Sequence, residues 1–195
     1  FIKAQVNDKY MPLSQEDFEE AAEQLEVEVA AIRAVDDIES NGSGFFESGE
    51  PKILFEAHWF HRLTGGEYDE SHPNISSPQW DRSLYKGGQE EHTRLQEATS
   101  LDRKAALQSA SWGRYQILGV NWDKCGYNNV QYFINDMYDS EAGHLGAFVS
   151  FIKNEGLANV LREKDWHAFA REYNGPGYER NDYAYRMKRA YEQYS

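Results

Sequence analysis

Apolar side chains near the start of the chain recur at the spacing of an amphipathic helix. At about 100° per residue they fall on one side of a helix that we expect over about 27–39. These residues are Leu25, Ile32, Val35 and Ile38. A preceding helix over about 14–24 is indicated by Ser14 followed by Asp17, a pair that resembles an N-terminal cap. The run Asn-Gly-Ser-Gly at 41–44 then breaks the second helix, whose last residues open onto a turn.

The pattern beyond this turn predicts one small β-hairpin and then mostly helices. Two short apolar runs, 45–47 and 52–56, flank a Ser-Gly-Glu-Pro turn. A Gly- and Pro-containing loop over 65–88 follows and can form one wall of a cleft. We expect the other helices over about 57–64, 89–99, 102–110, 129–136, 139–154, 164–173 and 179–193. The fold class is therefore α+β and predominantly α-helical, with one domain over 14–195 after an N-terminal linker over 1–13.

Glu39 is the first candidate for chemistry, because it closes the second helix on its apolar side. It follows Val35 by four residues and Ile32 by seven. Asp37 projects roughly opposite and Asp36 lies near the edge, so only Glu39 is expected to point inward. A half-buried carboxylate beside a loop can hold a proton at neutral pH and deliver it, as sugar-cleaving enzymes require. The alternative is a structural glutamate bonded to a nearby backbone amide.

Cleavage of a glycosidic bond also needs a group that handles the positively charged sugar carbon. That group is a second carboxylate or the acetamido group of the substrate itself. The hairpin should fold back beside the helix end, so its glutamates are the candidates. Glu56 is preferred because it ends an apolar strand, Glu47 comes next, and Glu50 lies in the turn. The alternative for each is a solvated surface charge.

Two aromatic–amide pairs, Tyr115-Gln116 and Tyr173-Asn174, are candidate substrate-binding residues. An amide both donates to and accepts from sugar hydroxyl and N-acetyl groups, while the neighbouring ring orients the sugar. The alternative is a buried amide that braces a loop.

Composition and charge narrow the class of partner. The chain has 195 residues, 40% of them hydrophobic and 14% aromatic, as in a folded globular domain. Its net charge of −13 argues against nucleic acid or an anionic membrane as partner. The sole cysteine, Cys125, permits no intrachain disulfide. No apolar run approaches a membrane span of about 20 residues, and no signal peptide is visible. We therefore expect a cut-out or mature piece of a longer protein.

We expect no metal and no cofactor. His58 and His61 lie three residues apart near Glu56, but a zinc site would need a further ligand in a defined arrangement. No Gly-rich phosphate loop and no Gly-x-Ser-x-Gly motif is present.

Taken together, the motifs resemble those of the lysozyme-like superfamily, near goose-type lysozymes and soluble lytic transglycosylases. The closer resemblance is to the N-acetylmuramidase domain of phage endolysins and related bacterial wall-lysing proteins, and it spans about 20–194. The segments that carry it are Glu39-Ser40-x-Gly-Ser-Gly-Phe45, Pro51-Lys52-Ile53-Leu54-Phe55-Glu56-x-His58, Ala110-Ser111-Trp112-Gly113, Cys125-Gly126-Tyr127, Asp165-Trp166 and Tyr173-Asn174-Gly-Pro-Gly-Tyr178.

This resemblance implies a lysozyme-like fold and cleavage of the β-1,4 bond between N-acetylmuramic acid and N-acetylglucosamine in peptidoglycan. It implies Glu39 as general acid and adds Ser40 and Ser111 to the candidate binding residues. The chain departs from transglycosylases at Arg114-Tyr115, where they prefer apolar residues before Gln. Three functions stay open: a muramidase, a lytic transglycosylase using the same Glu39, and an inactive glycan-binding module.

The same resemblance sets the expected location and partners. Many endolysins that act from outside are basic, whereas this chain is acidic. We therefore expect action in the bacterial periplasm or at the cell wall, after delivery by a lysis machinery or a secretion system. The expected partner is the peptidoglycan glycan strand, with an immunity or inhibitor protein as a further candidate, and the chain is expected to be a monomer.

Overall fold

The computed structural model describes residues 11–40, 42–175 and 177–195, so most of the predicted linker over 1–13 lies outside the described residues. Within these ranges the α-helices are α1 Gln15–Leu25, α2 Val29–Glu39, α3 Ala57–Thr64, α4 Glu90–Leu101, α5 Arg103–Ser109, α6 Val130–Asp139, α7 Glu141–Asn154, α8 Ala158–Arg162, α9 Trp166–Asn174 and α10 Tyr183–Tyr194. The strands are β1 Ile53–Phe55, β2 Ala110–Trp112 and β3 Ile117–Leu118, and the short 3₁₀ helices are η2 Arg82–Leu84, η3 Gly119–Asn121 and η4 Tyr178–Asn181.

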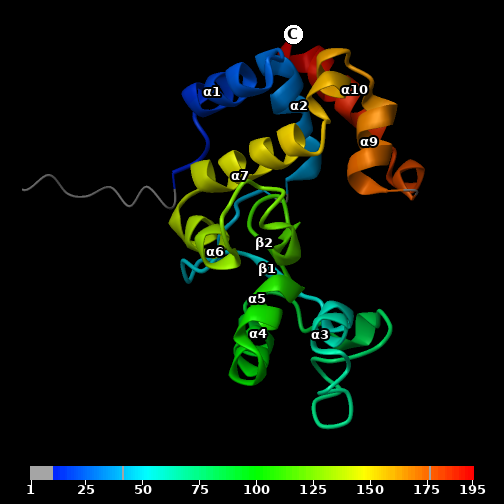
Figure 1. Ribbon diagram of the computed structural model, residues 1–195. Helices are drawn as coiled ribbons and strands as arrows, with labels where there is room; N and C mark the ends of the chain where they lie inside the picture. The colour runs from blue at the N-terminus through cyan, green and yellow to red at the C-terminus, as the bar shows by residue number, and fades with distance from the viewer. Residues whose placement is uncertain (1–10, 41, 176) are drawn as a thin grey trace, which may run out of the picture.

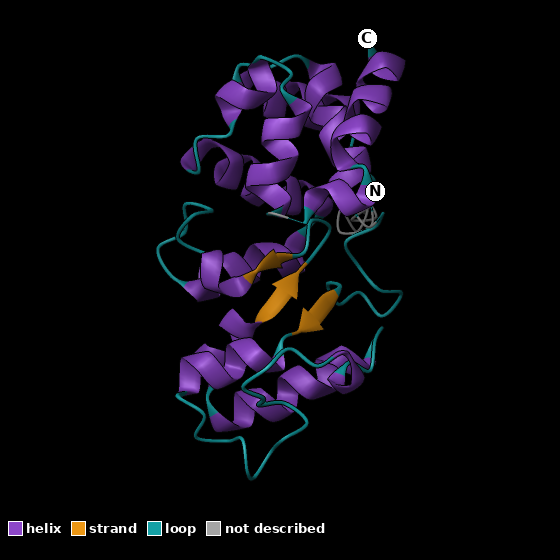
Figure 2. Cartoon of the chain, turned by 90° about the vertical axis from the view of Figure 1, so that its right-hand side faces the viewer, coloured by secondary structure: helices purple, strands orange, loops and turns teal. Residues whose placement is uncertain are grey.

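The helices form two groups with the small sheet between them. Figure 1 shows α1, α2, α7, α9 and α10 together in the upper part, and α3, α4 and α5 in the lower part. The view in Figure 2, turned by 90°, shows the strands between the same two groups. The predicted α+β, mainly helical fold is confirmed.

The first two helices form for the reasons that the sequence indicates. The Ser14 Oγ accepts a hydrogen bond from the Asp17 N–H at 3.1 Å, and Asp17 Oδ2 accepts one from the Ser14 N–H at 2.6 Å. This reciprocal cap satisfies two backbone donors at the start of α1. In α2, Ile32 and Val35 are completely buried, as the apolar spacing predicts. Burial of this side against the core, with α10 as its main neighbour, fixes the direction in which α2 ends.

The predicted hairpin is the main difference from the sequence expectation. Phe45 and Pro51 form one isolated bridge, and the segment between them makes no ladder. The strand β1 pairs instead with β2, which pairs antiparallel with β3. A local pattern cannot identify a strand partner so distant in the chain, and Ala110, the first residue of β2, was expected to close the helix over 102–110.

The register of the sheet divides its residues between two faces. Leu54, Ser111 and Leu118 stand opposite one another across the three strands and are half-buried. Their neighbours Trp112 and Ile117 point to the other face and are buried. The first face therefore provides an accessible floor, and the second packs towards the lower helices.

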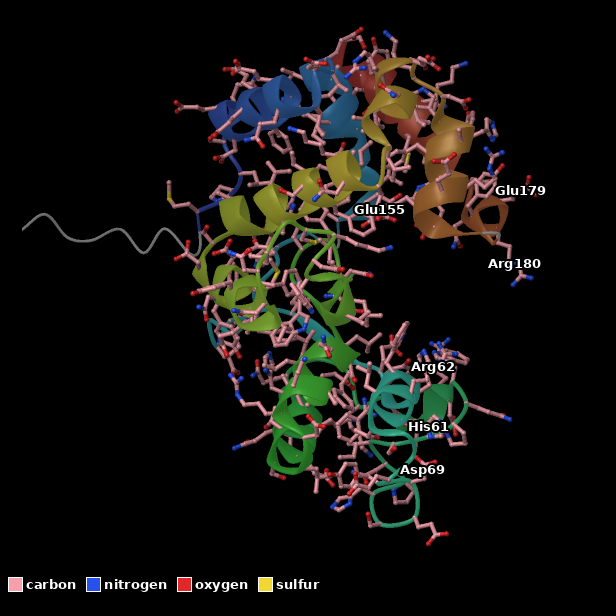
Figure 3. The ribbon with its side chains drawn as sticks, in the orientation of Figure 1. His61, Arg62, Asp69, Glu155, Glu179 and Arg180 are labelled. Atoms are coloured by element: carbon pink, nitrogen blue, oxygen red, sulfur yellow. The ribbon has the colours of Figure 1, made fainter. Side chains whose placement is uncertain are left out.

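The predicted loop over 65–88 is present and is tied down by its own side chains. Asp69 accepts a hydrogen bond from Ser76 Oγ at 2.6 Å, and one of its carboxylate oxygens lies 2.8 Å from His61 Nδ1. Figure 3 shows His61 on α3 beside Asp69 in the loop. The loop is thus fastened to α3 at the lower right of the molecule.

Candidate active site

Glu39 is the last residue of α2, and its side chain enters a cavity of about 370 Å³. This cavity is lined by residues from α2, the turn before β3, β3, η3, α7, α9 and α10. They are Ile38, Glu39, Tyr115, Gln116, Ile117, Leu118, Asn121, Phe151, Tyr173, Asn174 and Tyr183. Five of the predicted site residues therefore come together from three distant segments. Glu39 is the only carboxylate among these lining residues.

The environment of Glu39 favours its protonated form. Burial raises the pKa of the carboxyl group from its ordinary value of 4.5 to about 7. A hydrogen bond from Asn174 Nδ2 to Oε1, at 2.9 Å, opposes this rise, as does the positive charge of Arg186. The result is a carboxyl group that keeps a proton near neutral pH and yet can release it, which is what a general acid needs.

Tyr173 and Asn174 lie at the end of α9, and aromatic packing fixes their position. The Tyr173 ring stacks on Phe169, with centroids 5.7 Å apart, and meets Phe148 and Phe151 edge to face. Burial, followed by the nearby charge of Glu39, raises the pKa of the Tyr173 hydroxyl well above its ordinary value. Tyr173 therefore stays a hydrogen-bond donor beside Glu39.

Tyr115 and Gln116 line the cavity, but some of their polar atoms already form hydrogen bonds within the protein. The Tyr115 ring stacks on Phe148 at 4.1 Å, and its hydroxyl donates to Asp36 Oδ1 at 2.6 Å. The Gln116 Nε2 donates to the carbonyl oxygens of Gly113 at 2.9 Å and Lys52 at 3.2 Å. Its side-chain oxygen accepts no hydrogen bond within the described residues, so this oxygen is the group that Gln116 offers to a ligand.

Asp36 corrects the expectation that Glu39 alone among the three acids points inward. Asp36 is 3% exposed, less than Glu39 or Asp37. Both its oxygens bind the Arg114 guanidinium, through Nε and Nη2 at 2.8 Å each, in addition to the Tyr115 hydroxyl. A helical projection places Asp36 at the edge of the stripe, but it cannot show that an arginine from the turn before β3 compensates its charge.

Arg114 connects Asp36 to a further buried acid on α7, which holds the loop after Glu39. Glu141 Oε1 accepts hydrogen bonds from the Gly44 N–H at 2.7 Å and the Ser43 Oγ at 3.0 Å. Its Oε2 lies 3.5 Å from Arg114 Nη1, which also donates to the Gly42 carbonyl at 2.8 Å. The sequence analysis gave no role to these residues, because only the tertiary structure brings α2, the turn and α7 together.

His144 completes this network as a neutral side chain. Its Nδ1 accepts from the Arg114 N–H at 3.0 Å, so its Nε2 carries the proton donated to the Met137 carbonyl at 2.8 Å. Burial lowers the pKa of His144, in agreement with a neutral ring. A Cβ atom on Gly44 would lie 2.2 Å from the ring, so the loop can approach this closely only with glycine there.

The remaining predicted site residues lie outside the cavity lining. Ser40 follows Glu39 and donates its N–H to the Asp36 carbonyl at 2.9 Å. Ser111 belongs to the half-buried row of the sheet beside Leu118. Glu47 is exposed in the turn after Phe46. Glu50, the glutamate expected in that turn, accepts a hydrogen bond from Gln89, the residue before α4.

Glu56 begins α3, beyond the far strand of the sheet. It follows Leu54 by two residues, so it extends the half-buried face away from Leu118. Two strand spacings, roughly 10 Å, separate β1 from β3. The Tyr85 hydroxyl donates to Glu56 Oε2, and His58 Nδ1 lies 3.4 Å from the same oxygen. Glu56 is therefore held by Tyr85 and His58, outside the residues that line the Glu39 cavity.

The open side of the molecule continues from the cavity towards α3. Figure 3 shows Glu179 and Arg180 of η4 facing Arg62 of α3 across this side. The walls beyond the cavity thus carry charges of both signs.

Other candidate chemistry finds little support in the described part of the chain. No group of three or more His, Cys, Asp or Glu side chains there is arranged to hold a metal ion. The Cys125 side chain is buried, and burial raises the pKa of its thiol to about 12, which agrees with a structural role. Among the helices described, none has the length and apolar character to span a membrane.

A mainly helical fold with a small three-stranded sheet and a half-buried glutamate in a cavity is typical of lysozyme-like hydrolases. The chain belongs to the N-acetylmuramidase family, whose model matches residues 28–195. It is also similar to the crystal structure of a Burkholderia AP3 phage endolysin, with a TM-score of 0.88 and 37% identity. That match covers 93% of this chain and 70% of the endolysin chain. No match is found among curated proteins. The chain is a peptidoglycan hydrolase, as its motifs imply.

The raised pKa of Glu39 predicts how folding stability depends on pH. Between about 4.5 and 7 the folded protein keeps a proton that the unfolded chain loses, so wild-type stability falls as pH rises through this range. A Glu39→Gln variant has no ionisable group at this position, so its stability does not fall in this way as pH rises. Its stability relative to the wild type should therefore increase by about 3 kcal/mol from pH 4 to pH 8. Urea unfolding of both proteins at these pH values tests this, and a constant difference would show that Glu39 is an ordinary exposed acid.

Proposed function

We propose that the chain cleaves the β-1,4 bond between N-acetylmuramic acid and N-acetylglucosamine, with Glu39 as general acid. The observation that carries this proposal is a carboxyl group with a pKa of about 7 in a cavity that is otherwise lined by uncharged groups. Membership of the N-acetylmuramidase family supports the choice of substrate.

In the proposed reaction Glu39 gives its proton to the oxygen that links the two sugars. The bond from that oxygen to the muramic acid C1 breaks, and the positively charged sugar carbon reacts next. Asn174 orients the Glu39 carboxyl group through its hydrogen bond. The Gln116 side-chain oxygen and the Tyr173 hydroxyl bind sugar N–H and hydroxyl groups, and the row of Leu118, Ser111 and Leu54 supports the strand.

The second catalytic group separates two enzyme functions. A carboxylate pair about 5 Å apart is needed for a covalent intermediate, and a wider pair of up to about 9.5 Å activates water instead. Glu56 follows β1, which lies two strand spacings, roughly 10 Å, from β3, so we assign it to the wider arrangement. We therefore propose Glu56 as the base of an inverting hydrolase and keep Glu47 as the second choice.

One observation favours a lytic transglycosylase. Glu39 is the only acid among the described residues that line the cavity. Without a second carboxylate, attack by a hydroxyl group of the muramic acid itself would close an anhydro sugar. A glycan-binding module is the third reading, and in that case Glu39 contributes to binding and not to turnover.

Mass spectrometry of fragments from purified peptidoglycan distinguishes these functions. We expect muramic acid at reducing ends with the wild type, and no fragments with Glu39→Gln. Glu56→Gln should reduce the yield next most strongly, because it removes the proposed base. Anhydro-muramic ends, with Glu56→Gln unaffected, would instead assign the chain to the transglycosylases. Absence of fragments from the wild type would support the binding module.

The proposed place of action is the bacterial cell wall, reached through a lysis machinery or a secretion system. The substrate determines this location, because glycan strands occur outside the cytoplasmic membrane. The net charge of −13 favours walls with little anionic polymer.

A further inference from the structure

A second and larger cavity, a groove of about 920 Å³, shares no lining residue with the Glu39 cavity. Trp112 forms part of its floor, and neighbouring residues of a strand point to opposite faces. The groove therefore lies on the face of β2 opposite to Ser111. Its walls come from α4 and α6. In Figure 1, α6 lies to the left of the strands and α4 below them, whereas α9 and α3 lie to the right.

The two walls present uncharged polar side chains at helical spacing. On α4 and the residue before it, Gln89, Thr93, Gln96 and Ser100 follow at intervals of four, three and four residues, so they share one face. On α6, Gln131, Asn135 and Tyr138 do the same. Such amides and hydroxyls both donate and accept hydrogen bonds, as a ligand rich in hydroxyl and acetamido groups requires.

The charge of the groove contrasts with that of the whole chain. The protein has a net charge of −13. The groove, in contrast, is lined by one acid, Glu50, one arginine, Arg103, and one histidine, His92. This near-neutral lining has no cluster of like charges that could bind a strongly charged peptide or polymer. A partner helix would need an apolar groove, and these walls are mainly polar. A neutral oligosaccharide matches the lining best.

Side chains within the groove are already ordered for binding. Gln131 Nε2 donates to Asn135 Oδ1 at 2.8 Å, and Arg103 donates to Gln131 Oε1. Tyr138 is 38% exposed and lies 6.2 Å from the Trp112 ring, so part of its ring is accessible beside a rigid neighbour. A sugar ring can stack on such an aromatic surface, while the Asn135 and Gln96 amides bind its substituents.

We propose that this groove is a second glycan-binding site, which takes a neutral strand of N-acetylated sugars at a place separate from the Glu39 cavity. It holds the enzyme on one strand of the wall while the Glu39 cavity acts on another. The proposal rests on the proposed function only for the identity of the polymer.

The test uses a tetramer of N-acetylglucosamine and the Glu39→Gln protein, which does not consume the probe. Titration followed by amide NMR should shift two groups of signals, one around Asn174 and one around Gln96 and Asn135. Adding Tyr138→Ala should weaken binding in the groove about tenfold, or about 1.4 kcal/mol, and leave the Asn174 group unchanged. Gln96→Ala, which removes an exposed amide, should weaken groove binding without affecting the fold.

Tyr132→Ala is the matched control, since Tyr132 lies on the same helix, is 55% exposed and does not line the groove. It should alter neither affinity. Shifts confined to the Asn174 group would overturn the proposal. Groove binding that survives both Tyr138→Ala and Gln96→Ala would also overturn it. Groove signals that shift with protein concentration alone would overturn it too, because they would indicate that a second copy of the chain binds there.

The two proposals fail separately in this design. Binding of the tetramer in the groove is measured without turnover. The titration therefore tests the second site even when the wild type releases no fragments from peptidoglycan. Conversely, fragments from the wild type with no groove signals would leave the proposed function intact and remove the second site.

Discussion

Replacing Glu39 by glutamine should lower the rate of peptidoglycan cleavage by about a thousandfold while the cavity still binds glycan. Glutamine keeps the shape of the side chain and can still meet the Asn174 amide, but it has no proton to transfer. The pKa of about 7 gives this prediction a second part. Wild-type activity should fall with rising pH above about 7, since the general acid is then ionised.

The measurement is the rate of fragment release from purified peptidoglycan across a pH series, with binding of a glycan oligomer measured alongside. Asp37→Asn is the matched control, because Asp37 lies on the same helix, is exposed and accepts a hydrogen bond from the Tyr194 hydroxyl. That variant should keep near-wild-type rates. Lysis by Glu39→Gln at a near-normal rate would refute the assignment of the acid, and loss of binding with it would indicate a binding module.

Replacing Asp36 by alanine should destabilise the fold by about 3–5 kcal/mol. The change leaves the Arg114 guanidinium and the Tyr115 hydroxyl without the carboxylate that both now contact. Burial of a charge without its partner is costly, and the buried pair connects the end of α2 to the turn before β3. Activity should fall as well, because Gln116 in that turn would no longer be held relative to Glu39.

Urea unfolding of the wild type and Asp36→Ala measures the free energy of unfolding directly. The control is Glu155→Ala, which removes the exposed ion pair of Glu155 with Lys124, an interaction 3.0 Å long. Such exposed pairs contribute at most about 1 kcal/mol. If both variants lose the same small amount of stability, the Asp36–Arg114 pair is not the connection that we infer.

Glu39 is recognisable from the sequence because its signal is local. The periodicity of Ile32 and Val35 defines the buried side of α2, and Glu39 shares that side. The pairs Tyr115-Gln116 and Tyr173-Asn174 were recognisable because aromatic–amide neighbours are unusual, and the structure brings both to the cavity. Their catalytic and binding roles remain predictions.

The sequence pattern misplaced or left out what depends on distant partners. It paired the strand Ile53–Phe55 with its neighbour in the chain, whereas the structure pairs it with Ala110–Trp112. It placed Asp36 at a helix edge and gave no role to Glu141 or His144. Each of these depends on a contact between segments far apart in the sequence, and no local pattern carries that information.

The amino-acid sequence by itself determined most of the helices, though not α8, and also where α2 ends and that Glu39 stands on its buried side. Helical periodicity and turn residues act over short stretches of chain. Only the tertiary structure decided the pKa of that acid, since burial and the Asn174 amide, which raise and lower it, come from packing against other helices. It also decided that Asp36 is buried with Arg114 and that the Glu56 carboxylate accepts a hydrogen bond from the Tyr85 hydroxyl. Solvent exclusion and charge pairing act through space, and so they appear only when the chain is folded.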